Sequence, residues 1–193
     1  MLVGLTGGIG SGKTIVSKVF ETMGCFIYNS DEKAKALYNN SNIKKNVIEL
    51  LGTESYLNEH EINKEYISKK VFNYPELLQK LNQIIHPAVK EDFINFKNKL
   101  PEKSIIVKET ALLFEAGINK DLDYTILVTA PIDIKIKRVM SRNHISKEEV
   151  EKRMSSQWSD EQKKNLANIV ITNDESLALI PQVISIIEKL KNA

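Results

Sequence analysis

Short apolar segments alternate with amphipathic segments along much of the chain. Apolar and β-branched side chains dominate five short segments, a composition typical of buried strands. These segments span residues 2–5, 25–28, 104–107, 123–129 and 168–172. Between them, apolar residues recur at helical spacing, as Val16, Val19 and Phe20 do in the segment 13–24. Strands that alternate with helices in this way predict a parallel sheet covered by helices.

The stretch from about residue 42 to residue 100 interrupts the alternation, because it is mostly helical and lacks clear strands. We expect Pro87 to start, bend or interrupt a helix there. Farther along, Pro131 should begin a helix that runs through Arg142. Ser146 and Glu149 have the spacing of a capping box for the next helix. A last amphipathic helix follows, and Pro181 leaves its first residue open.

The composition is that of an ordinary globular protein. The chain has 193 residues, 42% of them hydrophobic and 27% charged, which indicates one domain with or without a substantial insert. A net charge of +2 without a basic tail does not indicate nucleic acid as a partner. The single cysteine, Cys25, excludes an internal disulfide. Neither a membrane span nor a secretory signal is apparent, so we expect a cytoplasmic protein.

The glycines cluster at the N-terminus. Of eight glycines, five fall within the first twelve residues, and "GGIGSGKT" at 7–14 matches the pattern G-x-x-x-x-G-K-[ST]. An apolar strand precedes the match and an amphipathic helix follows it, which is the context that gives this motif weight. The alternative, a glycine-rich hairpin without a ligand, does not account for that context.

Each residue type in this loop suits a triphosphate. Backbone without side chains lets successive N–H groups point at one anion, and the dipole of the following helix favours negative charge. Lys13 can then bridge the β- and γ-phosphates. Thr14 offers a hydroxyl group to Mg²⁺, and the amide of Ile15 can reach the α-phosphate.

The other motifs favour a small-molecule kinase over a switch GTPase. The sequence "NKDL" has leucine where a base-reading motif needs its second carboxylate, and D-x-x-G does not occur. A kinase needs a carboxylate near the γ-phosphate. Asp31 follows the second strand and Glu109 ends the third, at the edge where open α/β sheets bind ligands. Asp31 could equally cap a helix, and Glu109 could equally be a solvated strand end.

Arginine is rare, and all of it lies in one region. Three of the 27 basic residues are arginines, Arg138, Arg142 and Arg153. The first two share one helix face at a spacing of four. Because a guanidinium group binds phosphate oxygens in a way that lysine cannot copy, we interpret the region as a lid over ATP. The alternative is a set of surface ion pairs with the glutamates of 148–151.

These elements together resemble the dephospho-CoA kinase family. The resemblance spans nearly the whole chain, and the ordered combination of motifs is more specific than the P-loop alone. The motifs are "VGLTGGIGSGKT", "NSDEKAK", "VFNYPE", "IIHPAV", "ALLFEAG", "RVMSRNHISKEEVEKRMSSQ" and "IVITND".

The resemblance implies ATP-dependent phosphorylation of the ribose 3′-hydroxyl of dephospho-CoA, with Mg²⁺ as cofactor. The implied fold is α/β, a five-stranded parallel P-loop sheet like that of the nucleoside-monophosphate kinases. The core would be residues 1–40 and 101–193, with a helical CoA-binding insert at about 41–100 and a lid at about 138–157. Neither nucleic acid nor a membrane would be a partner.

The resemblance also implies roles for individual residues. Asp31 would be the catalytic base and a substrate ligand, and Lys13, Arg138 and Arg142 would act on the transferring phosphoryl group. ATP would contact Gly8, Ile9, Gly10, Ser11, Gly12, Lys13, Thr14, Ile15, Arg142 and Asn173, the last beside the adenine. The acceptor would contact Asp31, His86, Glu109, Leu113, Phe114 and Glu115. Taken alone, His86 and the segment 112–117 are more typical of structural positions.

One departure from the family pattern affects the metal. The family commonly has D-x-D where this chain has Asn29, Ser30 and Asp31. If the missing carboxylate helps to hold Mg²⁺, Glu109 would matter more here. Two rivals stay open: another small-molecule kinase of the same architecture, and a regulatory or RNA-associated NTPase.

Overall fold

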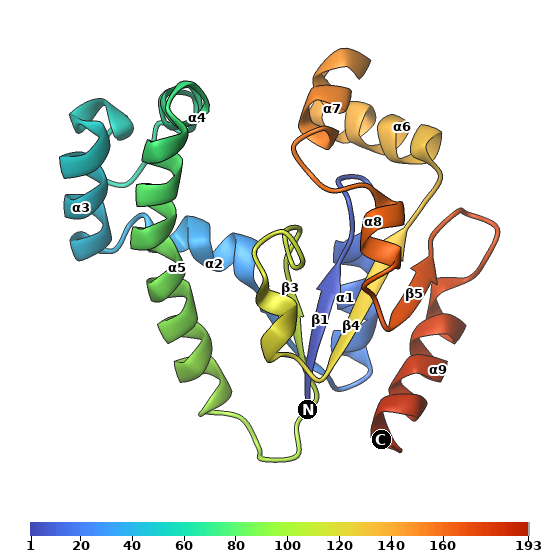
Figure 1. Ribbon diagram of the computed structural model, residues 1–193. Helices are drawn as coiled ribbons and strands as arrows, with labels where there is room; N and C mark the ends of the chain where they lie inside the picture. The colour runs from blue at the N-terminus through green and yellow to red at the C-terminus, as the bar shows by residue number, and fades with distance from the viewer. Residues whose placement is uncertain (193) are drawn as a thin grey trace. The chain divides into compact units, whose positions relative to one another are not determined.

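The computed structural model describes residues 1–192 and divides into two compact units (Figure 1). The first unit comprises residues 1–29 and 101–193, and the second comprises Ser30–Leu100. The helical stretch that the sequence places at about 41–100 falls within the second unit. No helix among residues 1–192 is both long and apolar enough to cross a membrane.

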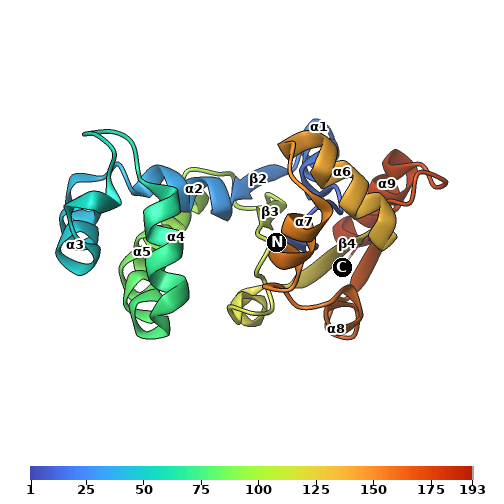
Figure 2. The same ribbon diagram turned by 90° about the horizontal axis from the view of Figure 1, so that it is seen from above.

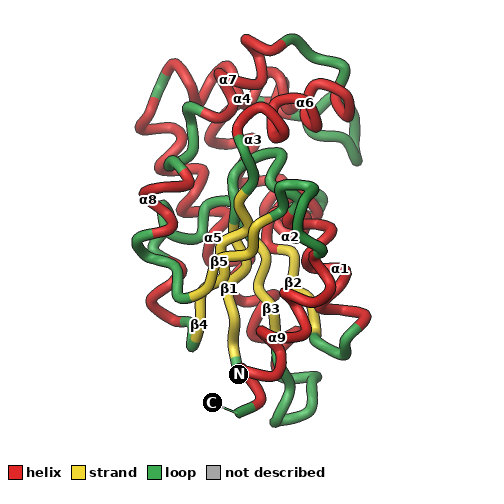
Figure 3. Tube along the Cα trace, turned by 90° about the vertical axis from the view of Figure 1, so that its right-hand side faces the viewer, coloured by secondary structure: helices red, strands yellow, loops and turns green. Residues whose placement is uncertain are grey.

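A five-stranded parallel sheet forms the centre of the first unit. Its strands are β1 (Leu2–Thr6), β2 (Phe26–Asn29), β3 (Ile106–Glu109), β4 (Tyr124–Thr129) and β5 (Ile169–Thr172). They lie in the order β2-β3-β1-β4-β5, and every neighbouring pair is parallel. Figure 3 shows the strands side by side with helices around them. The predicted fold class is confirmed, and all five predicted strands lie within two residues of their expected positions.

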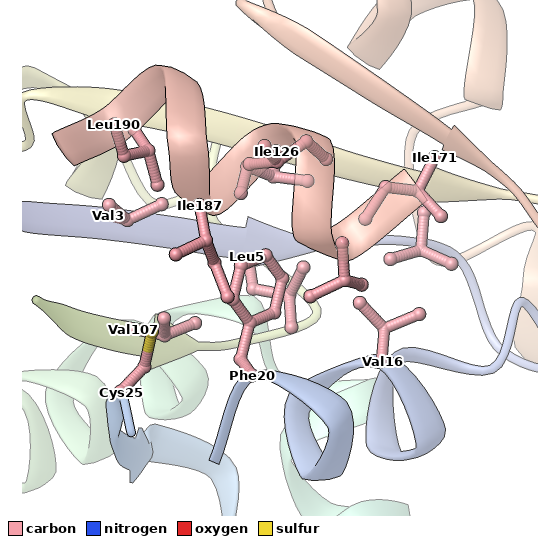
Figure 4. Close-up of a cluster of buried hydrophobic side chains, with 13 residues drawn as sticks. Val3, Leu5, Val16, Phe20, Cys25, Val107, Ile126, Ile171, Ile187 and Leu190 are labelled. Carbon is pink, nitrogen blue, oxygen red and sulfur yellow. The ribbon is translucent and has the colours of Figure 1, made fainter. Parts of the chain in front are cut away.

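Two helices from opposite ends of the chain cover one face of this sheet. These are α1 (Lys13–Thr22) and α9 (Leu179–Lys191), which also contact each other. Figure 4 shows Phe20 of α1 and Ile187 of α9 packed with Leu5 and Ile126 of the sheet. The apolar stripes of the two helices therefore form the main core. Pro181 is the third residue of α9, where a proline does not break helical hydrogen bonds.

The remaining helices of the first unit lie between β4 and β5 in the chain. They are α6 (Ile132–Asn143), α7 (Lys147–Met154) and α8 (Asp160–Lys164). The capping box of Ser146 and Glu149 is confirmed at the start of α7. A second capping box, formed by Ser159 and Gln162, starts α8, a helix that the sequence analysis did not predict. A short 3₁₀ helix, Ile118–Asp121, precedes β4.

The second unit consists of helices around its own apolar core. The helices are α2 (Ser30–Leu37), α3 (Ser41–Leu51), α4 (Lys64–Asn73) and α5 (Pro75–Lys97), with a 3₁₀ turn at Thr53–Ser55. Both α3 and α4 pack on α5 (Figure 2). Val47, Ile67 and Leu81 are among the buried residues that they share.

Pro87 lies inside α5, so of the three expected effects it neither starts nor interrupts the helix, and a bend stays a prediction. A proline removes one helical hydrogen bond, which disfavours an interior position. Here Leu81 and Ile85 bury the helix on the apolar cluster of the second unit, and this packing outweighs the lost bond.

The packing of α9 leads to a stability prediction. We expect Ile187→Ala to lower the free energy of unfolding by about 2–5 kcal/mol, because it leaves a cavity in the core. Ile187 is 6% exposed, whereas Ile184 on the same helix is 39% exposed. Ile184→Ala is therefore the matched control and should cost less than about 1 kcal/mol. Urea titrations of the two variants test this, and equal losses would contradict the assigned core.

Candidate active site

The glycine-rich turn between β1 and α1 has a backbone that other residues could not adopt without strain. Gly10 has φ +82° and Gly12 has φ +94°. A Cβ on Gly10 would lie 2.5 Å from the carbonyl oxygen of Lys135, and one on Gly12 would collide with the side-chain amide of Asn173. The turn is therefore packed from outside by α6 and by the segment after β5.

The start of α1 has the geometry of an anion site. Gly12 is the N-cap residue, and the helix begins at Lys13. The first N–H groups of a helix generally lack a partner within it and can face an anion. Here the N–H of Ile15 donates to the carbonyl oxygen of Gly12 at 3.0 Å. Lys13 Nζ donates to the carbonyl oxygen of Gly7 at 3.2 Å, which holds its ammonium group over the turn. Thr14, in the first turn of α1, is exposed.

Asn173 and Arg138 join two distant segments to this turn. Asn173 is buried, and its Nδ2 donates to the carbonyl oxygen of Ser11 at 2.8 Å. Arg138 on α6 donates to the carbonyl oxygen of Gly10 at 3.4 Å and to the Asn173 carbonyl at 3.2 Å. Its guanidinium also pairs with Glu175 Oε1 at 3.1 Å. The structure thus brings together the glycine turn, Arg138 and Asn173, all of which the sequence analysis assigned to ATP.

Arg142 lies apart from the turn. It is exposed on α6, and its Nε donates to Asn143 Oδ1 at 2.8 Å. Arg142 and Arg138 line one hollow of about 470 Å³ together with Lys137 and Glu175. The spacing of four does place the two guanidinium groups along the same face of α6, as the sequence predicts.

Ile9 in the turn is held by the region that the sequence assigns to a lid. Its side chain packs against a cluster that includes Ile136, Val139 and Val150 of α6 and α7. Its N–H donates to Gln157 Oε1 at 2.9 Å. Gly8 lies next to it and lines a cavity of about 780 Å³ with residues of 129–135 and 154–161.

The last residue of β3 lies beside the turn. Glu109 is opposite Leu5 of β1 on one side and Asn29 of β2 on the other, and it is buried. In a parallel sheet all carboxyl ends meet at one edge, so Glu109 and Asn29 end at the edge from which the glycine turn rises. Thr6 Oγ1 donates to the carbonyl oxygen of Ala111 at 3.3 Å and joins the two loops.

The loop after β3 is packed rather than open. Leu113 is fully buried and lies over Gly4 of β1, and Phe114 is buried as well. Glu115 forms an ion pair with Lys163 at 2.9 Å and accepts a hydrogen bond from the backbone N–H of Trp158 at 3.0 Å. Burial acts to raise the pKa of the Glu115 carboxyl, but these hydrogen bonds outweigh it, so the pKa lies below its ordinary value.

Asp31 and His86 belong to the second unit. Asp31 is the second residue of α2, inside the first helical turn rather than at the cap, and a carboxylate is favourable there. His86 is exposed midway along α5. Their roles toward the acceptor stay predictions.

Five polar residues at the sheet edge were missed by sequence reasoning. Lys135 Nζ pairs with Asp160 at 2.8 Å, and Thr129 Oγ1 also bonds to Asp160. Gln157 and Lys163 make the contacts given above. The capping pattern of Ser159 and Gln162 could have located α8. Nothing in the sequence distinguishes Lys163 from the many surface lysines.

The comparisons with known proteins agree with this geometry. The chain matches the dephospho-CoA kinase family over residues 1–178. It is 37% identical over 186 residues to a dephospho-CoA kinase of Bacteroides fragilis, covering 96% of this chain and 90% of the relative. A dephospho-CoA kinase of Chlorobaculum tepidum is 38% identical over 184 residues, covering 92% of this chain and 88% of the relative.

A solved structure is similar over the same extent. The crystal structure of TT1252 from Thermus thermophilus matches with a TM-score of 0.88 and 29% identity, covering 98% of this chain and 96% of that one. The family consists of kinases that phosphorylate dephospho-CoA with ATP in coenzyme A synthesis. Sequence, sheet topology and glycine turn agree, and the chain belongs to the dephospho-CoA kinase family.

Proposed function

We propose that the chain transfers the γ-phosphoryl group of ATP to the ribose 3′-hydroxyl of dephospho-CoA, giving CoA and ADP. The observation that carries the proposal is the glycine turn. In a member of this family, backbone without side chains meets a helix N-terminus at the carboxyl edge of the sheet. Such a site binds phosphate through oriented N–H groups.

In this proposal the ATP phosphates lie along the turn and the start of α1. The residues that hold them are Gly8, Ile9, Gly10, Ser11, Gly12, Lys13, Thr14 and Ile15. Lys13 moves from the Gly7 carbonyl to the β- and γ-phosphates, since a phosphate is the stronger acceptor. Asn173 lies beside the adenine. The location of Asn173 directly against Gly12 supports this assignment.

The oxygen donors near the turn suit Mg²⁺, the expected partner of ATP. Thr14 presents a hydroxyl group at the start of α1, and Glu109 ends the neighbouring strand with a carboxylate. Both are hard oxygen ligands of the kind that Mg²⁺ prefers, with phosphates and water completing its shell. When bound, Mg²⁺ would neutralise part of the phosphate charge.

Two arginines complete the nucleotide side. Arg138 and Arg142 line one hollow on α6, and Arg138 is already hydrogen-bonded to the turn. Both stabilise the charge of the transferring phosphoryl group, Arg142 after moving from its exposed position.

The acceptor side is assigned to Asp31, His86, Glu109, Leu113, Phe114 and Glu115. Asp31 accepts or orients the proton of the 3′-hydroxyl group. Glu115 keeps one buried oxygen, Oε2, without a hydrogen-bond partner among residues 1–192. A buried carboxylate oxygen without a donor is costly. A hydroxyl or amide group of the acceptor could supply that donor.

The direct test of the reaction uses the purified chain with ATP, Mg²⁺ and dephospho-CoA. We expect CoA to form, detected by mass as the addition of one phosphoryl group. Nucleosides and shikimate serve as comparison acceptors, because kinases of the same architecture use such alcohols. Faster phosphorylation of one of these would contradict the proposed acceptor.

Lys13→Ala should reduce kcat by a factor of at least about 10², because a charge that stabilises the transition state is lost. Steady-state kinetics with saturating ATP measure this. Lys18→Ala, which removes an exposed lysine from the same helix, is the control and should keep normal turnover. Normal turnover of the Lys13 variant would refute the phosphate assignment.

Asp31→Asn should lower kcat at least tenfold, because loss of a general base typically costs a factor of about 10²–10⁴ in rate. ATP affinity, measured by calorimetry, should stay nearly unchanged, since Asp31 belongs to the second unit and not to the turn. Glu32→Gln changes the neighbouring carboxylate and is the matched control. If Asp31→Asn turns over normally, this residue is not the base.

A further inference from the structure

A fully buried lysine lies at the carboxyl edge of the sheet. Lys163 is 0% exposed although it is in the five-residue helix α8. Removing an ammonium group from water is unfavourable unless its hydrogens are all well used. The contacts of Lys163 therefore indicate what its burial achieves.

Both contacts of Lys163 lie in the loop after β3. Its Nζ donates to the carbonyl oxygen of Ala111 at 2.9 Å and to Glu115 Oε1 at 2.9 Å. One charged group thus joins two points of the loop that are four residues apart. This loop also contains Leu113 and Phe114, which the proposed function assigns to the acceptor side.

The segment that carries Lys163 also contacts the nucleotide side. Gln157 accepts a hydrogen bond from the N–H of Ile9 in the glycine turn. Asp160 pairs with Lys135 of α6 and bonds to Thr129 at the end of β4. We call residues 157–163 the brace. Figure 1 shows α8, which includes residues 160–163 of the brace, close to the upper ends of the central strands.

Glu115 links Trp158 and Lys163, which lie near the two ends of the brace. The same oxygen that pairs with Lys163 accepts a hydrogen bond from the backbone N–H of Trp158. A series of hydrogen bonds, joined at one point by the peptide bond between Gln157 and Trp158, therefore runs from Ile9 through the brace to Ala111. Because charge-assisted hydrogen bonds are short and directional, this series fixes the distance between the two loops.

We infer that Lys163 is a positioning residue of the reaction, which holds the loop 110–117 in register with the nucleotide turn. The inference rests on the proposed function, because it assigns that loop to the acceptor. A role in stability alone is a weaker explanation, since an apolar pair of similar volume is often as stable as a buried ion pair. The two hydrogen bonds from Lys163 fix the orientation of the loop, which an apolar pair would not do.

The test compares Lys163→Met and Lys163→Arg, with Lys164→Met as control for an exposed lysine on the same helix. We expect Lys163→Met to raise the KM for dephospho-CoA at least about tenfold, since hydrogen bonds to a charged group are lost. The KM for ATP should change less than about twofold, since the turn keeps its own contacts. Lys163→Arg should recover much of the acceptor affinity, and Lys164→Met should match the unmodified protein.

A double variant separates the effect of Lys163 on the position of the loop from its effect on folding. Lys163→Met alone leaves a buried, uncompensated carboxylate and could unfold the chain. Lys163→Met with Glu115→Gln removes that charge, while the Gln oxygen can still accept from Trp158. Its melting temperature should be at least as high as that of Glu115→Gln alone, because that single variant leaves the buried ammonium group of Lys163 uncompensated. Its KM for dephospho-CoA should nevertheless stay several-fold higher than in that single variant.

The outcomes discriminate between the two proposals. If the unmodified protein does not phosphorylate dephospho-CoA, the proposed function fails and this inference fails with it. If it does, an unchanged acceptor KM in a folded Lys163→Met or in the double variant overturns this inference alone. An equal rise in the KM values for ATP and dephospho-CoA would also overturn it, because it would indicate general loosening.

Discussion

A triphosphate can lie against a protein backbone only where no side chain stands between them. In this chain that constraint falls on the turn between β1 and α1, and neighbouring elements are packed to maintain it. Asn173 fills the space in which Gly12 lacks a side chain, and the backbone of Lys135 fills the space beside Gly10. The parallel sheet supplies the position, because its strand ends and the N-terminus of α1 meet at one edge.

The parts of the fold that follow from local pattern could be predicted from the sequence. Buried strands in a parallel sheet are short and apolar, and α1 and α9 have clear apolar stripes, so their positions were predictable. Pro87 could not be assigned from its own preference, because packing of α5 on its neighbours decides its place. The helix α8 is too short for periodicity to detect, and only its capping residues indicate it.

In the candidate site too, local features could be predicted from the sequence, whereas contacts between distant segments could not. The glycine turn was predictable, since each residue type in it has a local physical reason. Arg138 and Arg142 look equivalent in sequence, yet only Arg138 reaches the backbone of the turn. Lys163 and Glu115 are 48 positions apart by their numbers, and their pairing depends on how the loop after β3 meets α8. Contacts of this kind depend on tertiary structure, and one sequence does not contain a local signal for them.

The anchoring of α6 limits how the segment after it could move. Two successive turns of this helix have contacts outside it. Lys135 forms an ion pair with Asp160, and Arg138 donates a hydrogen bond to the carbonyl oxygen of Gly10. On the far side, Gln157 is fastened to Ile9. The segment between these two anchors, residues 139–156, comprises the end of α6, the left-handed residue His144, α7 and the short connections on either side of α7. Because this segment is held at both ends, it can move only a short distance while those contacts persist.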